Sequence, residues 1–243
     1  MNQLVLMMSC DKNQGKTLMA ITLANVLSRE SKVLLIDVTT SKKTIASYLG
    51  VEEQIVYDVG DMMLGTCQMD SAIMEVRIGE VVVDFIPAPR MRTKIYNRAE
   101  LIEKLSILPA QKYDFIIIDG IELCSTDYYY DYTSINYLIM MIESKIEDLK
   151  KINIATQKIG KEALENTYFV LSRYHKTLYQ KGQLLSGKEI EEMMNISIIG
   201  QIDEEKRFES IDRYTELPKE ILEPFLNMAN QFSEIFQNHK ISQ

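Results

Sequence analysis

Residues 4–17 read LVLMMSCDKNQGKT, and this stretch decides the fold. Its first part, residues 4–8, is apolar without interruption, which predicts a short buried strand. Apolar residues then recur at helical spacing after Thr17, so the chain is expected to continue as a helix. One predicted face of that helix carries Ala20, Leu23, Ala24 and Leu27. A buried strand that leads through a polar loop into an amphipathic helix is the repeating unit of α/β proteins.

Similar apolar runs recur along the chain and predict further buried strands. They lie at 33–36, 81–86, 115–118, 138–142, 168–171 and 196–199. Runs that are apolar throughout are typical of parallel strands covered by helices on both faces. Further helices are predicted at 99–108, 144–158 and 188–194. We therefore expect a doubly wound α/β fold with a mostly parallel sheet. Because no composition break or internal repeat divides the sequence, residues 1–243 are predicted to form a single domain.

The composition indicates a soluble globular protein. Of the 243 residues, 46% are hydrophobic and 26% are charged, which excludes a disordered or collagen-like chain. A net charge of -8 opposes attraction to a nucleic-acid backbone, so we do not expect nucleic acid as a partner. No apolar run approaches the length of a transmembrane segment. The 3 cysteines form neither a disulfide framework nor a metal-binding pair, and we expect a cytoplasmic protein.

The loop after the first strand has the residues of a phosphate-binding P-loop. In such a loop Gly15 lets the backbone close around phosphate oxygens, and Lys16 reaches the outer phosphates. Thr17 offers a hydroxyl group to magnesium. Cys10 stands where the usual pattern has its first glycine, so an ordinary strand-to-helix turn is the alternative. The predicted nucleotide contacts in this loop are Lys12, Asn13, Gln14, Gly15, Lys16, Thr17 and Leu18.

Two aspartates are predicted to approach this loop from other strands. Asp37 ends the second predicted strand, and Asp119 ends a later one. Ligands of open α/β sheets bind beyond the carboxyl ends of the strands, so both carboxylates are candidates to hold magnesium together with Thr17. Each aspartate alone is equally consistent with an ordinary turn. If the site is catalytic, its candidate residues are Lys16, Asp37 and Asp119.

These segments resemble the MinD/ParA family of deviant Walker ATPases, which are P-loop NTPases, over nearly the whole chain. The resemblance rests first on the Gly-Lys-Thr loop at 15–17 and on the strand at 33–37. It continues through IASYLG at 45–50 and through the strand that ends at Asp119, which is similar to a Walker B strand. The resemblance implies ATP and Mg²⁺ as cofactors.

Segments near the end of the chain extend the resemblance. FVLSRY at 169–174 is similar to the family's base-side strand, and IIGQID at 198–203 is similar to its I-G-x-I-P-like element. By this resemblance Ser172, Arg173 and Asp203 are expected near the nucleotide base. The two segments look most like the pilus-assembly branch of the family, which is called CpaE or TadZ.

The resemblance also implies how such a protein acts. Members of the family form ATP-dependent homodimers that hold two nucleotides between the subunits, and nucleotide binding controls a partner or a surface. We therefore expect a dimeric positioning or regulatory factor for the assembly of a pilus, a secretion system or a division-type apparatus. Its expected partners are a second copy of itself and protein components of that assembly.

The chain departs from the family pattern at positions that serve hydrolysis. The family's signature lysine, which reaches the partner subunit's phosphates, falls at Asp11, and a carboxylate there would repel a triphosphate. The second aspartate of the family, which is implicated in positioning the attacking water, falls at Thr39. The D-x-P-x-G switch reads DGIEL at 119–123. Because phosphoryl transfer depends on positioned charge, we expect weak or absent hydrolysis with nucleotide binding retained.

Two other functions stay open at this point. One is a scaffold that binds no nucleotide and acts only through protein contacts. The other is a P-loop tyrosine kinase-like enzyme, suggested by the tyrosine-rich stretch DYYYDY at 127–132. Aromatic packing at an interface or helix edge is favoured for that stretch, because it lies in mid-chain. Cys124, which follows Asp119, is interpreted as an inert buried thiol rather than a cluster ligand.

Two helical segments raise the question of membrane and DNA contacts. Residues 219–236 carry apolar residues on one face, and acidic residues on the other face disfavour a membrane surface. We expect that helix to dock against the sheet through Leu222, Phe225, Ala229, Phe232 and Phe236. Basic residues at 145–161 alternate with Glu143, Glu147 and Asp148. That alternation predicts a solvated face of mixed charge.

Overall fold

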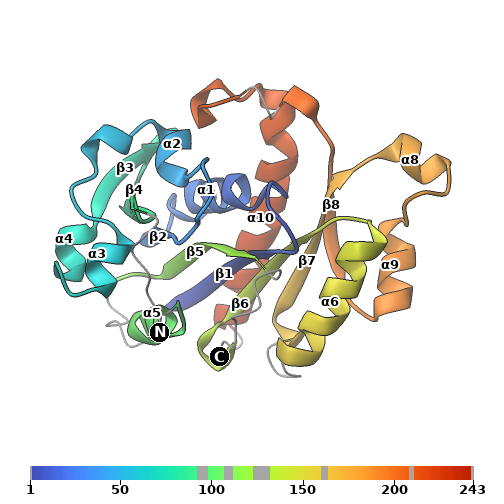
Figure 1. Ribbon diagram of the computed structural model, residues 1–243, viewed down its shortest axis with the longest axis horizontal. Coiled ribbons are helices and arrows are strands. Elements are labelled where there is room, and N and C mark those ends of the chain that lie inside the picture. Colours follow the sequence, from blue (N-terminus) through green and yellow to red (C-terminus); the bar gives the residue numbers. More distant parts are fainter. Residues whose placement is uncertain are drawn as a thin grey trace.

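The structure is built on one large sheet with helices on both faces (Figure 1). The computed structural model describes residues 2–91, 98–106, 112–122, 132–159, 164–207 and 211–241. Within these ranges eight strands form a sheet in the order β3-β4-β2-β5-β1-β6-β7-β8. The strands are β1 Gln3–Ser9, β2 Val33–Asp37, β3 Met74–Ile78, β4 Val81–Ile86, β5 Phe115–Glu122, β6 Tyr137–Ile142, β7 Thr167–Tyr174 and β8 Ile198–Asp203. The predicted α/β fold class is confirmed.

The sheet is parallel except at one edge. There β3 pairs antiparallel with β4, and the two strands are joined by a tight turn. The apolar runs of the sequence do not predict β3, because its residues alternate in exposure. Val76 and Ile78 are buried, whereas Glu75 and Arg77 are exposed. An edge strand with one solvated face has this alternation, while the central parallel strands are buried on both faces.

The buried side chains of the strands divide between the two faces of the sheet. Along β1, Leu4, Leu6 and Met8 join one apolar cluster, and Val5 and Met7 join the other. The first cluster includes residues of α5, α6 and α9, and the second includes residues of α1 and α10. The helices are α1 Lys16–Leu27, α2 Ile45–Leu49, α3 Val59–Met63, α4 Met69–Ala72, α5 Arg98–Ser106, α6 Ile146–Ile159, α8 Lys176–Gln180, α9 Gly187–Met194 and α10 Lys219–Ile241, with short 3₁₀ turns at Glu52–Gln54, Tyr132–Ser134 and Tyr214–Glu216.

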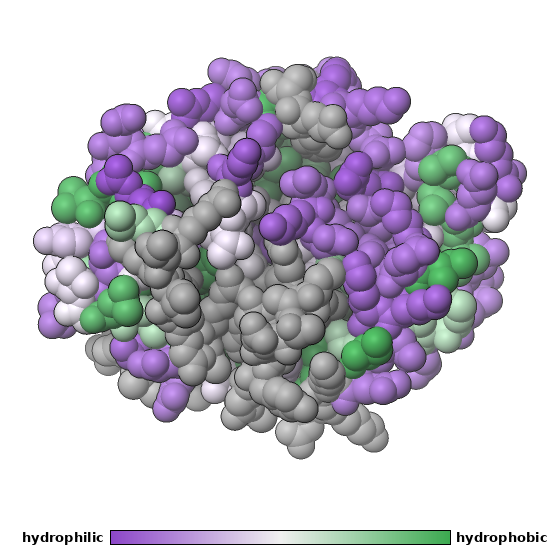
Figure 2. Space-filling model, viewed as in Figure 1, coloured by the Kyte–Doolittle hydropathy of each residue, from purple (hydrophilic) through white to green (hydrophobic). Residues whose placement is uncertain are grey.

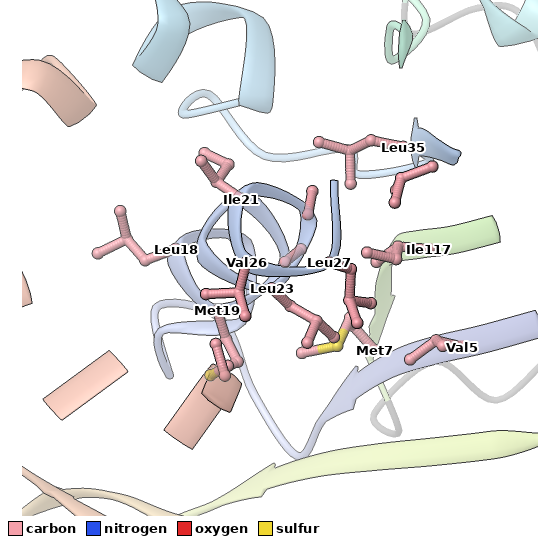
Figure 3. Packing of buried hydrophobic residues seen from close by; sticks show 14 of the residues in the cluster. Val5, Met7, Leu18, Met19, Ile21, Leu23, Val26, Leu27, Leu35 and Ile117 are labelled. Atoms are coloured by element: carbon pink, nitrogen blue, oxygen red, sulfur yellow. The ribbon is translucent and has the colours of Figure 1, made fainter. Parts of the chain in front are cut away.

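Helix α1 is buried on all sides, which differs from the one-sided helix predicted from the sequence. Side chains such as Leu18, Ile21, Leu23 and Val26 point away from the helix axis in different directions, and all are buried (Figure 3). The sheet covers α1 on one side, and α10 packs against it as well. The polar Thr22 is accommodated because its hydroxyl donates a hydrogen bond to the Leu18 carbonyl at 2.7 Å. The tertiary context therefore encloses the helix completely.

Helix α10 docks against α1 and the sheet, as the sequence predicts. Its apolar residues Phe225, Ala229, Phe232 and Phe236 are each no more than 2% exposed. The ring of Phe236 stacks on Tyr137 with a centroid distance of 4.0 Å. The buried aromatic face thus joins the C-terminal helix to the middle of the sheet.

The surface in the view of Figure 2 is mostly hydrophilic. Hydrophobic side chains show there as small separate groups. The large apolar residues with the highest exposure include Val56, Leu64, Met91, Ile146, Ile154 and Met193. Among the helices that the structure describes, none has the length and apolar character needed to cross a membrane.

Three predicted strands have wrong bounds. β7 continues to Tyr174 instead of ending at 171. β8 runs from Ile198 to Asp203 instead of 196–199, because α9 is followed by Asn195 in a left-handed conformation and the chain needs further residues to enter the sheet. β5 does not end at Asp119 but continues to Glu122. Gly120 is an extra residue in β5 at this point, because Asp119 and Ile121 pair with consecutive residues of β1.

Gly120 allows the segment after β2 to approach β5 closely. Its φ of 127° lies in the region that favours glycine. A Cβ atom at this position would lie 2.6 Å from the backbone nitrogen of Thr39. The neighbouring Val38 donates its N–H to the Asp119 carbonyl at 2.8 Å. The bulge therefore brings the chain that follows β2 against β5.

Replacing Phe236 tests the docking of α10. We expect Phe236→Ala to lower the free energy of unfolding by about 3–5 kcal/mol, because it leaves a cavity next to Tyr137. Chemical denaturation followed by circular dichroism measures the change. Glu234→Ala, on the exposed face of α10, serves as the control and should change stability by less than about 0.5 kcal/mol. Equal effects of the two substitutions would contradict the docked position.

Replacing Gly120 tests the close approach of Thr39. Gly120→Ala should lower the free energy of unfolding by about 2 kcal/mol or more, because the new methyl group meets backbone atoms and φ is unfavourable. Gly65→Ala is the matched control, since Gly65 also has a positive φ of 75° but no described atom lies within 4 Å of the place its Cβ would occupy. The control should lose only about 1 kcal/mol from backbone strain. Thermal or chemical denaturation measures the stability of both variants. An equal loss of stability in Gly120→Ala and Gly65→Ala would contradict the close approach of Thr39.

Candidate functional site

Two residues with positive φ shape the loop between β1 and α1. Asn13 has a φ of 62°, and Gly15, directly before α1, has a φ of 83°. Asparagine is one of the few other residues that adopt this conformation readily. A Cβ atom at Gly15 would also lie 3.4 Å from the ring of Phe225. Helix α1 then begins at Lys16, so the amide groups of its first turn, which have no acceptor within a helix, lie next to the loop.

A cleft of about 360 Å³ lies over this loop, at the carboxyl ends of the strands. Residues 12–18 all line it. Ser172 and Arg173 line it from β7, and Asp203 lines it from the end of β8. The fold thus brings to one cleft every residue that the sequence predicts as a nucleotide contact. The volume falls within the range of small-molecule sites.

The cleft is also lined by residues that the sequence analysis does not name as nucleotide contacts. The segment after β2 supplies Thr39, Ser41, Lys43 and Tyr48. Their position after the carboxyl end of a parallel strand is the pattern that could have identified them. Other lining residues come from the end of β8 and from α10, and they are Ile202, Glu204, Glu205, Lys206 and Phe225. The contribution of α10 depends on tertiary packing and leaves no local pattern.

Asp37 and Asp119 lie side by side in neighbouring strands, and neither is among the residues that line the cleft. Both are fully buried. The Asp37 carboxylate accepts hydrogen bonds from the amides of Thr39 at 2.8 Å and Ile45 at 2.7 Å, so it fixes the segment that leads into α2. Burial raises the pKa of Asp37, and these hydrogen bonds and the charge of Lys16 act in the opposite direction.

The charge of Asp119 affects the pKa of Tyr48, which lines the cleft. Burial raises the pKa of Tyr48, and the charges of Asp212 and Asp119 raise it further. Thr17 lines the cleft directly, at the start of α1. The buried carboxylates of Asp37 and Asp119 therefore lie near residues that line the cleft, and Thr17 lines the cleft itself. The assignment of Thr17, Asp37 and Asp119 to magnesium stays a prediction.

The carboxylate of Asp11 is directed to α6, and Asp11 is not among the residues that line the cleft. It forms an ion pair with Lys151 of α6 at 3.1 Å. Its other oxygen accepts the amide hydrogen of Lys12 at 3.0 Å. The hydrogen bond from Lys151 lowers the pKa of Asp11. The repulsion of a triphosphate that the sequence suggests is therefore partly offset by a neighbouring ammonium group.

The predicted solvated face at the start of α6 is wrong for two of its acidic residues. Glu143 is 5% exposed and Asp148 is 4% exposed. Asp148 lies 3.5 Å from Lys151, and Glu143 lies 3.7 Å from Arg173. Asp148 is buried because its side of α6 packs against the phosphate loop, where Gln14 donates a hydrogen bond to it. Glu143, which precedes α6, is buried beside Arg173.

The far end of the cleft contains a distorted part of β7. Arg173 has a φ of 50°, and the pairing of β7 with β8 shifts between Leu171 and Tyr174. The Arg173 side chain forms an ion pair with Glu204 at 3.0 Å. The hydroxyl of Ser172 is buried, and among the described residues it has no hydrogen-bond partner. A buried hydroxyl of this kind is typical of a site that hydrogen-bonds a ligand.

Of the tyrosine-rich stretch at 127–132, the structure describes only Tyr132. Residues 123–131, which include Cys124 and most of that stretch, lie outside the described residues. Tyr132 is described, and its side chain is buried. Burial raises the pKa of Tyr132 to about 12. A buried, protonated phenol is a poor phosphate acceptor, because the attacking oxygen must reach a nucleotide.

Comparison with known proteins places the chain in a family. Residues 6–217 match the family model described as the CobQ/CobB/MinD/ParA nucleotide binding domain. The septum site-determining protein MinD of Synechocystis sp. is 26% identical over 214 residues, which cover 85% of this chain and 78% of that protein. The match to the family model therefore spans the residues that line the cleft, apart from Phe225 of α10.

Solved structures show the same fold. The MinD chain in the MinC:MinD cell division protein complex of Aquifex aeolicus has a TM-score of 0.76 with 18% identity, and the match covers 96% of each chain. MinD of Pyrococcus horikoshii, solved with Mg-ADP, has a TM-score of 0.73 with 18% identity and 97% coverage of each chain. The chain belongs to the CobQ/CobB/MinD/ParA nucleotide-binding family and is a MinD/ParA-type P-loop protein.

Proposed function

We propose that this protein is a single nucleotide-binding domain that binds ATP with magnesium in the cleft over the β1–α1 loop. The observation that carries the proposal is the geometry of that loop. Gly15 has a left-handed backbone, Lys16 follows it at 7% exposure, and both line a cleft of about 360 Å³. Amide groups at a helix start and a partly enclosed ammonium group are suited to a chain of phosphates.

The residues of the cleft fit a nucleotide at both ends. Lys16 and the amides of the first turn of α1 would hold the phosphates, and the Thr17 hydroxyl would face magnesium. Leu18, Ile202 and Phe225 offer apolar surface for a base. Ser172 lines the cleft as well, and its buried hydroxyl has no partner among the described residues. Bound magnesium would neutralise phosphate charge and balance the carboxylates of Asp37 and Asp119.

Hydrolysis is proposed to be weak or absent. Thr39, which lines the cleft, stands where the family has an aspartate that positions water. Asp11 occupies the position of the family's signature lysine, and its carboxylate is engaged by Lys151. Each change removes a charged group from the reaction, and the loss of one such group can slow phosphoryl transfer on the order of 10³-fold. Nucleotide occupancy, and not rapid turnover, would then set the state of the protein.

The proposed biological role is that of a homodimeric positioning or regulatory factor for a larger assembly. The Aquifex MinD neighbour was solved in complex with MinC, and the Synechocystis relative is named as a septum site-determining protein. These names support a division-type, pilus or secretion assembly as the class of partner. The segments at 169–174 and 198–203 favour the pilus-assembly branch. A protein without bound nucleotide that acts only as a scaffold is the alternative.

Titration calorimetry with Mg-ATP tests the proposal. The wild-type chain should bind Mg-ATP, and Lys16→Ala should weaken the affinity on the order of 100-fold, because it removes the ammonium group that contacts phosphate. Lys150→Ala removes an exposed lysine from α6 and is the matched control, with expected affinity equal to wild type. Absence of heat with the folded wild-type chain would favour the scaffold.

Phosphate release measures the proposed loss of hydrolysis. The wild-type chain should release phosphate from Mg-ATP at a rate close to the uncatalysed background. Thr39→Asp should raise the rate about tenfold or more, because it restores a carboxylate that can orient water. Thr39→Asn has a similar size without the charge and should leave the rate unchanged. Rapid turnover by the wild-type chain would contradict the interpretation of Thr39.

A further inference from the structure

The side chain of Gln14 forms an internal connection within the phosphate loop. Its Oε1 atom accepts hydrogen bonds from the amides of Cys10 at 3.0 Å and Asp11 at 3.2 Å. Its Nε2 atom donates to Oδ2 of Asp148 at 2.6 Å. Gln14 is 1% exposed, so the connection is shielded from water. One side chain thus joins the beginning of the loop, its later part and the first turn of α6.

Asp148 completes a closed set of contacts between the loop and α6. Its Oδ2 also accepts the amide hydrogen of Glu143 at 3.3 Å. Its Oδ1 lies 3.5 Å from Lys151, and Lys151 lies 3.1 Å from Asp11. The loop therefore contacts one turn of α6 through the hydrogen bond from Gln14 to a carboxylate and through the ion pair of Asp11 with Lys151. The Cys10 thiol also lies 3.8 Å from the Asp148 carbonyl oxygen. We call this set, Asp11, Gln14, Asp148 and Lys151, the loop clamp.

These contacts hold backbone groups at the beginning of the loop. Cys10 and Asp11 occupy positions where a glycine-containing loop has a freer backbone, and their amides are held by the Gln14 amide oxygen. A hydrogen bond from a neutral donor to a buried carboxylate is stronger than one between neutral groups. The Gln14–Asp148 bond is accordingly the strongest candidate for holding the loop in one conformation.

We infer that Gln14 and Asp148 are a pair of positioning residues, which hold the phosphate loop in the shape that binds nucleotide and make nucleotide affinity depend on the first turn of α6. The affinity part of this inference rests on the proposed function. By thermodynamic reciprocity, bound nucleotide stabilises the same turn of α6. Ile146 and Ile154 of α6 are 62% and 56% exposed. The first turn of α6 therefore belongs to a helix with a solvent-exposed face.

A charge-swap experiment separates this pairing from a general effect on folding. Gln14→Glu places a second carboxylate against Asp148 and should weaken Mg-ATP binding on the order of tenfold or more at pH 8. Adding Asp148→Asn reverses the hydrogen bond, because the Asn amide donates to the new carboxylate. The double variant should recover affinity to within about threefold of wild type. Glu147→Gln, which neutralises an exposed acid in the same turn, is the control and should bind as wild type does.

Hydrogen exchange of the nucleotide-free protein provides a readout that does not require ATP. Gln14→Ala should raise the exchange rates of the amides of Cys10 and Asp11 on the order of tenfold, while amides in the central strands keep their rates. Thermal denaturation of every variant verifies that it is folded. Asp148→Asn, which keeps a hydrogen-bond acceptor, provides a milder variant if Gln14→Ala does not fold.

The outcomes distinguish the inference from the proposed function. Unchanged exchange in Gln14→Ala together with unchanged Mg-ATP affinity would overturn the loop clamp. Loss of affinity in Gln14→Glu without recovery in the double variant would overturn the pairing of Gln14 with Asp148. A wild-type chain that binds no Mg-ATP would overturn the proposed function. In that case faster exchange of the Cys10 and Asp11 amides in Gln14→Ala would still support the loop clamp, and unchanged exchange would overturn it.

Discussion

The burial of α1 on all sides is the constraint on which the cleft depends. A helix with one apolar face can rotate or slide when its neighbours change, whereas α1 has no face that can be turned to solvent without exposing apolar surface. Its first turn is therefore fixed relative to β1 and to α10. The left-handed Gly15 joins this fixed helix to the central strand, and Phe225 closes the space beside it. The position of Lys16 is therefore set by the packing of the whole of α1, which includes residues that do not line the cleft.

The electrostatic character of the cleft follows from burial as well. Asp37 and Asp119 lie on neighbouring strands in register, and both are fully buried under the segment after β2. Carboxylates in such a place are costly unless hydrogen bonds or cations compensate them. Burial raises the pKa of Asp37. The hydrogen bonds that its carboxylate accepts from two backbone amides act against that rise, and so does the charge of Lys16. A bound divalent cation would compensate the negative charge of these carboxylates and of a phosphate chain at the same time. This is a physical reason why magnesium and nucleotide would bind together.

The sequence predicts the central part of the fold well and its edges poorly. Strands buried on both faces appear as apolar runs, so the predictions for β1, β2 and β4 lie close to the observed strands, while the alternating edge strand β3 leaves no such run. Residues 12–18 are predictable because Gly-Lys-Thr is a local pattern. Asp148 is not, because an acidic residue at the start of a helix is ordinary in sequence and its burial depends on the position of β1. Phe225 is expected to face the sheet, but its contact with Gly15 is a property of the tertiary structure.

The residues around the cleft divide into two groups by what they affect. Thr39 and Asp11 stand where the family resemblance has charged groups. The Lys151 ammonium group pairs with Asp11, and the Asp37 carboxylate accepts the amide hydrogen of Thr39. Asn13 and Gln14, by contrast, preserve the shape of the loop, one by adopting a positive φ and the other by bonding the amides of Cys10 and Asp11. A loop that loses its function altogether has no reason to keep buried hydrogen bonds that hold it open, because each buried polar group must be satisfied at some cost in packing. The buried hydrogen bonds of Gln14 therefore support the proposal that the site retains nucleotide binding.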